Sequence, residues 1–252
     1  MTKDYPVGTT VWQELEVPGT DGLAAFYRAV LGWELVLDGD RGRFLLDGEL
    51  VAGLVVRPGL PAARTGWRSY LGAEDLDAAV KRAVAAGSAV RTADKPIGVP
   101  GKAAELTDPF GAWFGLAETE PGAAVLPSPE IGRWAFVDPS NFDLASEVAF
   151  QDALFPGQHA DDREGVITIF RDENGLALRG SYEIHEEARA FLPPHWLPWI
   201  SVADQREATE IAVAHGGRAN TVDNVLTFAV WGVVADPQGA EFKVLQMTKN
   251  AI

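Results

Sequence analysis

The residues best able to do chemistry in this sequence are four histidines and many carboxylates, because it contains no cysteine. That absence excludes disulfides, thiolate metal sites and cysteine nucleophiles. No two histidines have i, i+4 spacing, so no histidine metal motif is present. His195 directly precedes an expected strand, and Glu14 lies on another beside Glu16, so we take His195 and Glu14 as weak candidates for a general base. A surface role for His195 and a solvated strand face for the glutamates are the simpler explanations.

Composition and charge exclude several classes of protein. The 252 residues are 47% hydrophobic and 23% charged, enough for two globular domains of about 120 residues each. No apolar run approaches the ~20 residues that cross a bilayer, and no export signal is visible at the first residues, so we expect a cytoplasmic protein. A net charge of −15 disfavours nucleic acid and anionic membranes as partners and favours a cationic or neutral ligand.

An internal repeat organises the chain. TDPFGAWFGL at 107–116 recurs as ADPQGAEFKV at 235–244, and Asp75 recurs as Asp204, with offsets of 124 to 129 residues throughout. A stretch rich in proline and glycine lies between the copies. The sequence therefore predicts a first domain at 1–120, a linker at 121–129 and a second domain at 130–252.

The elements expected in the first copy alternate in a fixed order. A helix over 23–31, with Thr20 or Asp21 as its cap and Gly32 as its end, follows the first strand. An amphipathic helix over 76–86 buries Leu76, Ala79, Val80, Ala83 and Val84. Strands are expected at 11–17, 33–37, 43–46, 51–56, 68–73, 89–92, 103–106 and 113–117. The order is βαβββ twice per copy, which predicts an α+β protein of four βαβββ modules.

This order is similar to a known family. The helix at 24–33, the segment EDLDAA at 74–79 and the two Asp-Pro-x-Gly turns resemble the vicinal-oxygen-chelate superfamily, which includes glyoxalases, bleomycin-resistance proteins and dioxygenases. The tandem actinobacterial type, and the accessory proteins of aromatic-polyketide antibiotic pathways, are the nearest in pattern. The resemblance implies mixed sheets curled into cups, with helices on the outer face and a ligand in the concave face.

The resemblance also provides a test for a metal. Metal-dependent members take histidine, glutamine or glutamate ligands from the first and last strands of their modules. The corresponding positions here are Trp12, Arg68 and Gly115 in the first copy and Trp134, Leu197 and Lys243 in the second. None of these six suits a divalent cation, although a shift of one residue would bring in Gln13, Glu14 or Glu241. We therefore expect neither a metal nor a cofactor.

Strand alternation predicts what would line the cups instead. Apolar residues of one phase, such as Leu15, Phe114, Leu116 and Phe242, suit packing beneath helices. The other phase mixes large aromatic residues with a few charges, which is typical of a small-molecule pocket. The predicted ligand-binding residues are Trp12, Glu14, Arg68, Tyr70, Trp113, Trp134, Phe136, His195, Trp199 and Glu241.

Three functions remain open from the sequence. The first is metal-independent binding of a planar aromatic molecule, such as an antibiotic or a biosynthetic intermediate. The second is a metal-dependent dioxygenase, hydroxylase or glyoxalase-like enzyme. The third is a cofactor-free cyclase, hydrolase or isomerase, because binding pockets and acid–base pockets share residue types. A small aromatic molecule is the expected partner, a biosynthetic enzyme is a further candidate, and the chain is a monomer or a homodimer.

Overall fold

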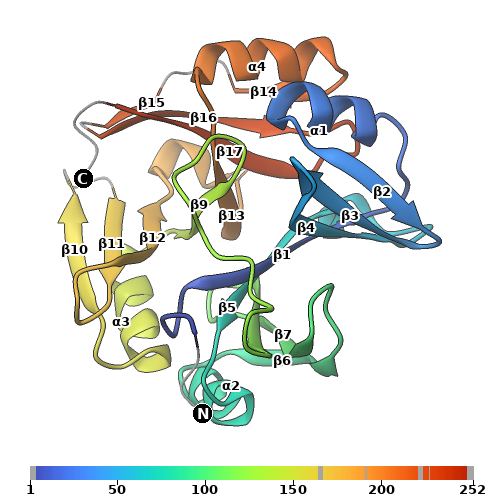
Figure 1. Ribbon diagram of the computed structural model, residues 1–252. Helices are drawn as coiled ribbons and strands as arrows, with labels where there is room; N and C mark the ends of the chain where they lie inside the picture. The colour runs from blue at the N-terminus through green and yellow to red at the C-terminus, as the bar shows by residue number, and fades with distance from the viewer. Residues whose placement is uncertain (1–3, 164–166, 191, 221–223, 227, 249–252) are drawn as a thin grey trace. The chain divides into compact units, whose positions relative to one another are not determined.

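Two mixed β-sheets and four α-helices make up the described part of the chain (Figure 1). The computed structural model describes residues 4–163, 167–190, 192–220, 224–226 and 228–248. Neither sheet closes into a barrel, and each contains the strands of one sequence repeat. The predicted α+β class and the tandem repetition of βαβββ modules are confirmed.

The first sheet has the strand order β2-β3-β4-β1-β5-β8-β7-β6. Its elements are β1 (Thr10–Val17), α1 (Leu23–Leu31), β2 (Glu34–Asp38), β3 (Arg41–Leu46), β4 (Glu49–Val56), β5 (Gly66–Gly72), α2 (Leu76–Ala85), β6 (Ala89–Lys95), β7 (Gly101–Thr107) and β8 (Trp113–Thr119). In each module the first and last strands pair in parallel, β1 with β4 and β5 with β8, whereas the hairpins are antiparallel. Two parallel neighbouring strands need a crossover connection, and in each module that connection contains a helix.

The second sheet repeats this plan in the order β10-β11-β12-β9-β13-β17-β16-β14, with β15 paired to β16. Its elements are β9 (Trp134–Asn141), α3 (Leu144–Leu154), β10 (His159–Arg163), β11 (Ile167–Arg171), β12 (Ala177–Glu183), β13 (His195–Ser201), α4 (Gln205–Ala214), β14 (Arg218–Ala219), β15 (Asn224–Leu226), β16 (Ala229–Ala235) and β17 (Glu241–Met247). Again the first and last strands of each module are parallel neighbours.

Side chains close in sequence cap the N-termini of three helices, whereas the N-terminal cap of α1 differs from the prediction. Three helices begin at an aspartate whose carboxylate accepts a hydrogen bond from the amide three residues later, at Asp75, Asp143 and Asp204. α1 instead begins at Gly22, with φ of 80° and no side-chain cap, so the predicted cap at Thr20 or Asp21 is wrong. Gly32 ends α1 with φ of 74°, as the sequence predicts.

The chain divides into two compact units, and each contains parts of both repeats. Unit 1 contains residues 1–12, 68–126 and 136–197, and unit 2 contains residues 13–67, 127–135 and 198–252. The divisions fall within β1, β5, β9 and β13, so each unit is built from one module of each copy.

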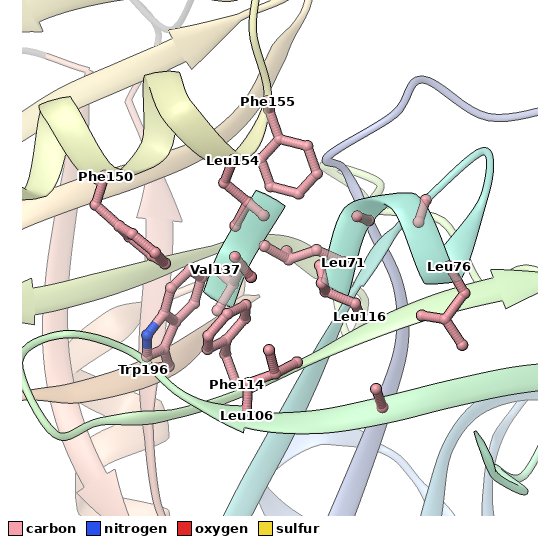
Figure 2. Packing of buried hydrophobic residues seen from close by; sticks show 14 of the residues in the cluster. Leu71, Leu76, Leu106, Phe114, Leu116, Val137, Phe150, Leu154, Phe155 and Trp196 are labelled. Atoms are coloured by element: carbon pink, nitrogen blue, oxygen red, sulfur yellow. The ribbon is translucent and has the colours of Figure 1, made fainter. Parts of the chain in front are cut away.

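The core of unit 1 forms between α2, α3 and the strands beneath them. Phe114 and Trp196 stack with ring centroids 5.2 Å apart, and Phe150 of α3 meets Phe114 edge-on (Figure 2). The Trp196 indole donates a 2.8 Å hydrogen bond to Asp108 in the first Asp-Pro-x-Gly turn. On α2, Leu76, Ala79 and Ala83 are buried, but Val84 is 47% exposed, which corrects the predicted apolar face.

The core of unit 2 is a cluster of aromatic rings beneath α1 and α4, which lie side by side (Figure 1). Trp33 stacks on Tyr27 at 5.6 Å, and Phe242 of β17 stacks on Tyr27 at 5.9 Å. The Tyr27 hydroxyl donates a 2.9 Å hydrogen bond to Asp236 in the second Asp-Pro-x-Gly turn. Each copy of the turn thus places a buried aspartate against an aromatic donor.

A chain of buried polar side chains joins α3 to β12 in unit 1. Glu147 accepts hydrogen bonds from Asn141 at 2.6 Å and from Gln151 at 2.7 Å. Gln151 in turn accepts from the guanidinium of Arg179 at 2.7 Å, and Arg179 also donates to Gln158 at 2.6 Å. Burial raises the pKa of Glu147 to about 7, with Asp108 adding to that rise, whereas the two amide hydrogen bonds and Arg179 oppose it.

Within the described residues, no helix is long and apolar enough to cross a membrane.

Candidate functional site

In unit 1, a row of side chains lies on the face of the sheet opposite α2. Tyr70 of β5 is registered against Gly115 of β8, and Gly115 against Glu105 of β7. Their chain neighbours Leu71, Leu106 and Leu116 pack in the core beneath α2. Because strand side chains alternate, Tyr70 and Glu105 project from the helix-free face.

Tyr70, Glu105 and Lys95 form a closed, buried hydrogen-bonded group on this face. The Tyr70 hydroxyl donates to Glu105 at 3.1 Å, and the Lys95 ammonium lies 2.8 Å from the Tyr70 oxygen and 2.5 Å from Glu105. Burial opposes ionisation of Glu105, but the bonds from Lys95 and Tyr70 outweigh it and lower the pKa of this carboxyl. The group is therefore an ion pair with a bridging phenol.

Two arginines stack on Trp113 on the same face. The guanidinium carbon of Arg68 lies 4.8 Å from the centre of the Trp113 ring, and that of Arg91 lies 4.0 Å from it. Arg68 is 8% exposed, whereas Arg91 is exposed and donates a short hydrogen bond to Thr107. We call Arg68, Trp113 and Arg91 the arginine–tryptophan stack. It combines one indole with two guanidinium groups that lie over its ring.

In unit 2, the corresponding row of the second repeat holds Trp199 of β13, Lys243 of β17 and Val233 of β16. The Lys243 ammonium lies 4.6 Å from the ring centre of Trp199 and 4.9 Å from that of Trp231. Phe242 and Val244, which flank Lys243, are buried, and Phe242 packs against Phe26 of α1. Lys243 therefore lies on the helix-free face of its sheet.

Comparisons with known proteins agree with this fold. Residues 13–117 match the model of the glyoxalase-like domain family. The manganese-bound glyoxalase of Novosphingobium aromaticivorans superposes with a TM-score of 0.63 at 15% identity, over 95% of this chain and 82% of that structure. Residues 13–117 are therefore similar to glyoxalase-like domains, and the whole chain shares the fold of that glyoxalase.

Two relatives match this chain over nearly their whole length. CFP32 of Mycobacterium tuberculosis, which carries a glyoxylase name, is 29% identical over 96% of both chains. The anthracycline biosynthesis protein DauV of a Streptomyces species is also 29% identical, over 98% of this chain and 96% of its own. The expected relation to proteins of antibiotic biosynthesis is thereby confirmed.

The residues of the first repeat at the positions that the resemblance assigns to metal ligands do not suit a divalent cation. A Cβ atom at Gly115 would lie 2.2 Å from the Tyr70 ring, so no carboxylate side chain fits there. The Trp12 indole packs on Gly98, where a Cβ would come within 2.3 Å of it. Arg68 brings a positive charge, which repels a metal ion.

The corresponding positions of the second repeat hold different residues, and these do not suit a divalent cation either. Lys243 places an ammonium where metal-dependent members have a carboxylate, and Leu197 is buried and apolar. Trp134 packs between Trp33 and Trp67 in the core of unit 2 and donates a hydrogen bond to the carbonyl of Val51. Throughout the described ranges, no group of three or more His, Asp or Glu side chains could hold a metal ion.

Four other predicted site residues lie on β1, β9, β13 and β17. Glu14 is buried on β1, registered against Gly53 of β4. The ring of Phe136 lies beside Gly180 of β12. His195 is partly exposed, with Nδ1 2.8 Å from the Pro193 carbonyl, and Glu241 is exposed at the start of β17.

The sequence did not point to Lys95 or Glu105. β6 extends to Lys95, three residues past the predicted end at Thr92, through two irregularities in its register with β7. Glu105 is a charged residue between Ala104 and Leu106, which are both buried, and this interruption of an apolar strand could have indicated a functional residue. No sequence pattern indicated the hydrogen-bonded group that extends from Glu147 to Arg179, because these residues are far apart in the sequence.

Unit 2 also has a surface groove of about 400 Å³ beside α1 and α4. None of the predicted ligand-binding residues lines this groove. Its walls include Val30, Leu31, Leu46, Ile131, Glu207 and Ile211.

Proposed function

We propose that this protein binds a planar aromatic small molecule without a divalent metal, and that it sequesters or delivers that molecule in secondary metabolism or resistance. The observation that carries the proposal is the arginine–tryptophan stack of unit 1. Its two guanidinium carbons lie within 5 Å of the centre of the Trp113 ring, and guanidinium and indole groups are both planar surfaces on which an aromatic ring can stack.

The local charge indicates which ligands suit this surface. Arg68 and Arg91 lie together at Trp113 in a protein whose net charge is −15, whereas the charge of the nearby Lys95 is paired with that of Glu105. Such a patch favours a ligand with acidic oxygens, in contrast to the amine-bearing ligand that the overall charge favours. DauV is named for anthracycline biosynthesis, and the aromatic core of an anthracycline is a planar quinone with phenolic oxygens.

Metal-dependent chemistry is the competing function, because a solved structure of this fold binds Mn(II). The residues at the metal positions favour the binding function. Gly115 is covered by the Tyr70 ring, and Lys243 contributes a positive charge. Binding should therefore persist when metals are removed.

The test is a titration with alizarin (1,2-dihydroxyanthraquinone) in excess EDTA, followed by quenching of tryptophan fluorescence. We expect saturable binding that Arg68→Ala weakens about tenfold, since a partly buried cation–π contact is worth roughly 1–2 kcal/mol. Arg41→Ala, which removes an exposed arginine of β3, is the matched control and should bind normally. Absence of quenching, or one equivalent of tightly bound divalent metal in chelator-free protein, would overturn the proposal.

A further inference from the structure

The groove beside α1 and α4 has a volume of about 400 Å³, which is within the range of small-molecule sites in proteins. Residues from the end of α1, the β3–β4 turn, the segment before β9 and the start of α4 line it. All of them belong to unit 2, whereas the arginine–tryptophan stack belongs to unit 1. The lining is mostly apolar, with Val30, Leu31, Leu46, Ile131, Val202, Ala203, Ala208 and Ile211.

Hydrogen bonds hold the backbone at one wall of this groove. The Gly132 amide donates to the carbonyl of Ser201 at 2.8 Å, and the Gly132 carbonyl accepts from the Trp33 indole at 2.7 Å. A Cβ atom at Gly132, where φ is 80°, would lie 3.0 Å from the Leu31 carbonyl oxygen. Because contacts within the protein fix this wall, little backbone has to be ordered when a ligand binds there.

The charged residues that line the groove are all acidic. Asp47 comes from the β3–β4 turn, and Asp204 and Glu207 come from the start of α4. Asp204 caps α4 by accepting a 2.9 Å hydrogen bond from the Glu207 amide. No residue in the described part of the chain forms an ion pair with Asp47 or Glu207. An apolar groove with carboxylates from two elements is complementary to an organic cation.

One further polar group belongs to the groove. Ser201 lines it and is 2% exposed, and the Ser201 hydroxyl has no hydrogen-bond partner among the described residues. Buried polar groups without a partner are rare in folded proteins. An N–H donor that reaches this oxygen from the groove would supply one, so the hydroxyl favours an amine over a hydrocarbon.

We propose that this groove binds a small organic cation, in which an apolar ring or chain carries a protonated amine. The ammonium would lie near the Asp47 and Glu207 carboxylates, while the apolar part would cover Ile131, which is 64% exposed. The net charge of −15 adds a long-range attraction. This site goes beyond the proposed function and does not depend on it, because the arginine–tryptophan stack favours the opposite ligand charge.

The probe is 1-adamantylammonium, a compact apolar cage with an ammonium group and no aromatic ring to stack on Trp113. Its anionic analogue of similar size is adamantane-1-carboxylate. Isothermal titration calorimetry at low salt should show saturable binding of the ammonium, about tenfold or more tighter than binding of the carboxylate.

Removing the acidic charges should weaken this binding. Glu207→Gln and Asp47→Asn should each weaken it about threefold, as expected for an exposed ion pair, and the double variant about tenfold. Asp47→Asn should keep the β3–β4 turn, because asparagine tolerates the left-handed φ of 52° found there. Glu210→Gln, which removes an exposed glutamate of α4 outside the groove, is the matched control and should bind as wild type.

A variant that fills the groove locates the binding. Ala203→Trp adds a large side chain at an exposed lining position and should abolish binding of the ammonium. Arg68→Ala, in unit 1, should leave it unchanged. Asp47, Ala203 and Glu207 are all exposed, so their variants should keep the wild-type Tm.

Three results would each overturn the proposal. They are wild-type protein that binds the ammonium no better than the carboxylate, a Glu207→Gln and Asp47→Asn double variant that binds it as tightly as wild type, and Ala203→Trp protein with undiminished affinity. Complete absence of ammonium binding falls under the first of these. The alizarin titration is a separate measurement, so these failures leave the proposed function standing.

Discussion

Glu147 should make the stability of this protein depend on pH near neutrality. The carboxyl is 1% exposed and lies among Asn141, Gln151, Asp108 and the Arg179 guanidinium. Its pKa rises from 4.5 to about 7, first because of burial and then because of the negative charge of Asp108. In the unfolded chain the same carboxyl titrates near its ordinary value.

The sign and size of the effect follow from proton linkage. Between pH 4.5 and about 7 the folded state holds a proton at Glu147 that the unfolded state has released. The stability from this residue is therefore full below pH 4.5 and is lost as the pH rises through 7. A pKa difference of this size corresponds to about 3 kcal/mol of unfolding free energy.

The assay is urea unfolding of wild type and Glu147→Gln, followed by circular dichroism from about pH 5 to pH 8. The amide in the variant cannot ionise, so the wild-type protein should lose about 2.5 kcal/mol relative to the variant across this range. Glu187→Gln, which removes an exposed glutamate, should show no such difference from wild type. If the gap between wild type and Glu147→Gln stays constant within about 0.5 kcal/mol, Glu147 does not titrate in the folded state and the reasoning is refuted.

Three further predictions concern packing and backbone. Gly115→Ala should lower the free energy of unfolding by about 1–3 kcal/mol because the new methyl overlaps the Tyr70 ring; Tyr70→Ala should relieve much of this loss in a double-mutant cycle measured with urea. Tyr27→Phe should cost about 1–3 kcal/mol in thermal unfolding, since it leaves the buried Asp236 without its phenol donor, and an unchanged Tm would count against that bond. Gly32→Ala should cost about 1 kcal/mol in the same assay, because φ is 74° at the end of α1; equal stability would show that this backbone relaxes freely.

Local patterns in the sequence predicted the elements well. The helix over 23–31 has the bounds that the structure shows, because Gly32 ends it and its apolar residues recur with helical period. The alternation in β8 placed Phe114 and Leu116 in the core correctly, since strand side chains have a period of two. The cap of α1 was missed, because Gly22 adopts a left-handed conformation that neighbouring polar residues do not reveal.

The sequence by itself determined the four modules and their repetition, because these depend on recurring motifs and on short-range periodicity. Only the tertiary structure decided which charges meet which rings. Lys95 contacts Tyr70 and Glu105 from an irregular strand, Lys243 lies within 5 Å of two indole rings from different strands, and Trp134 packs in a core. Such contacts join residues tens of positions apart, and their geometry depends on strand register and packing, which the local order of residues does not specify.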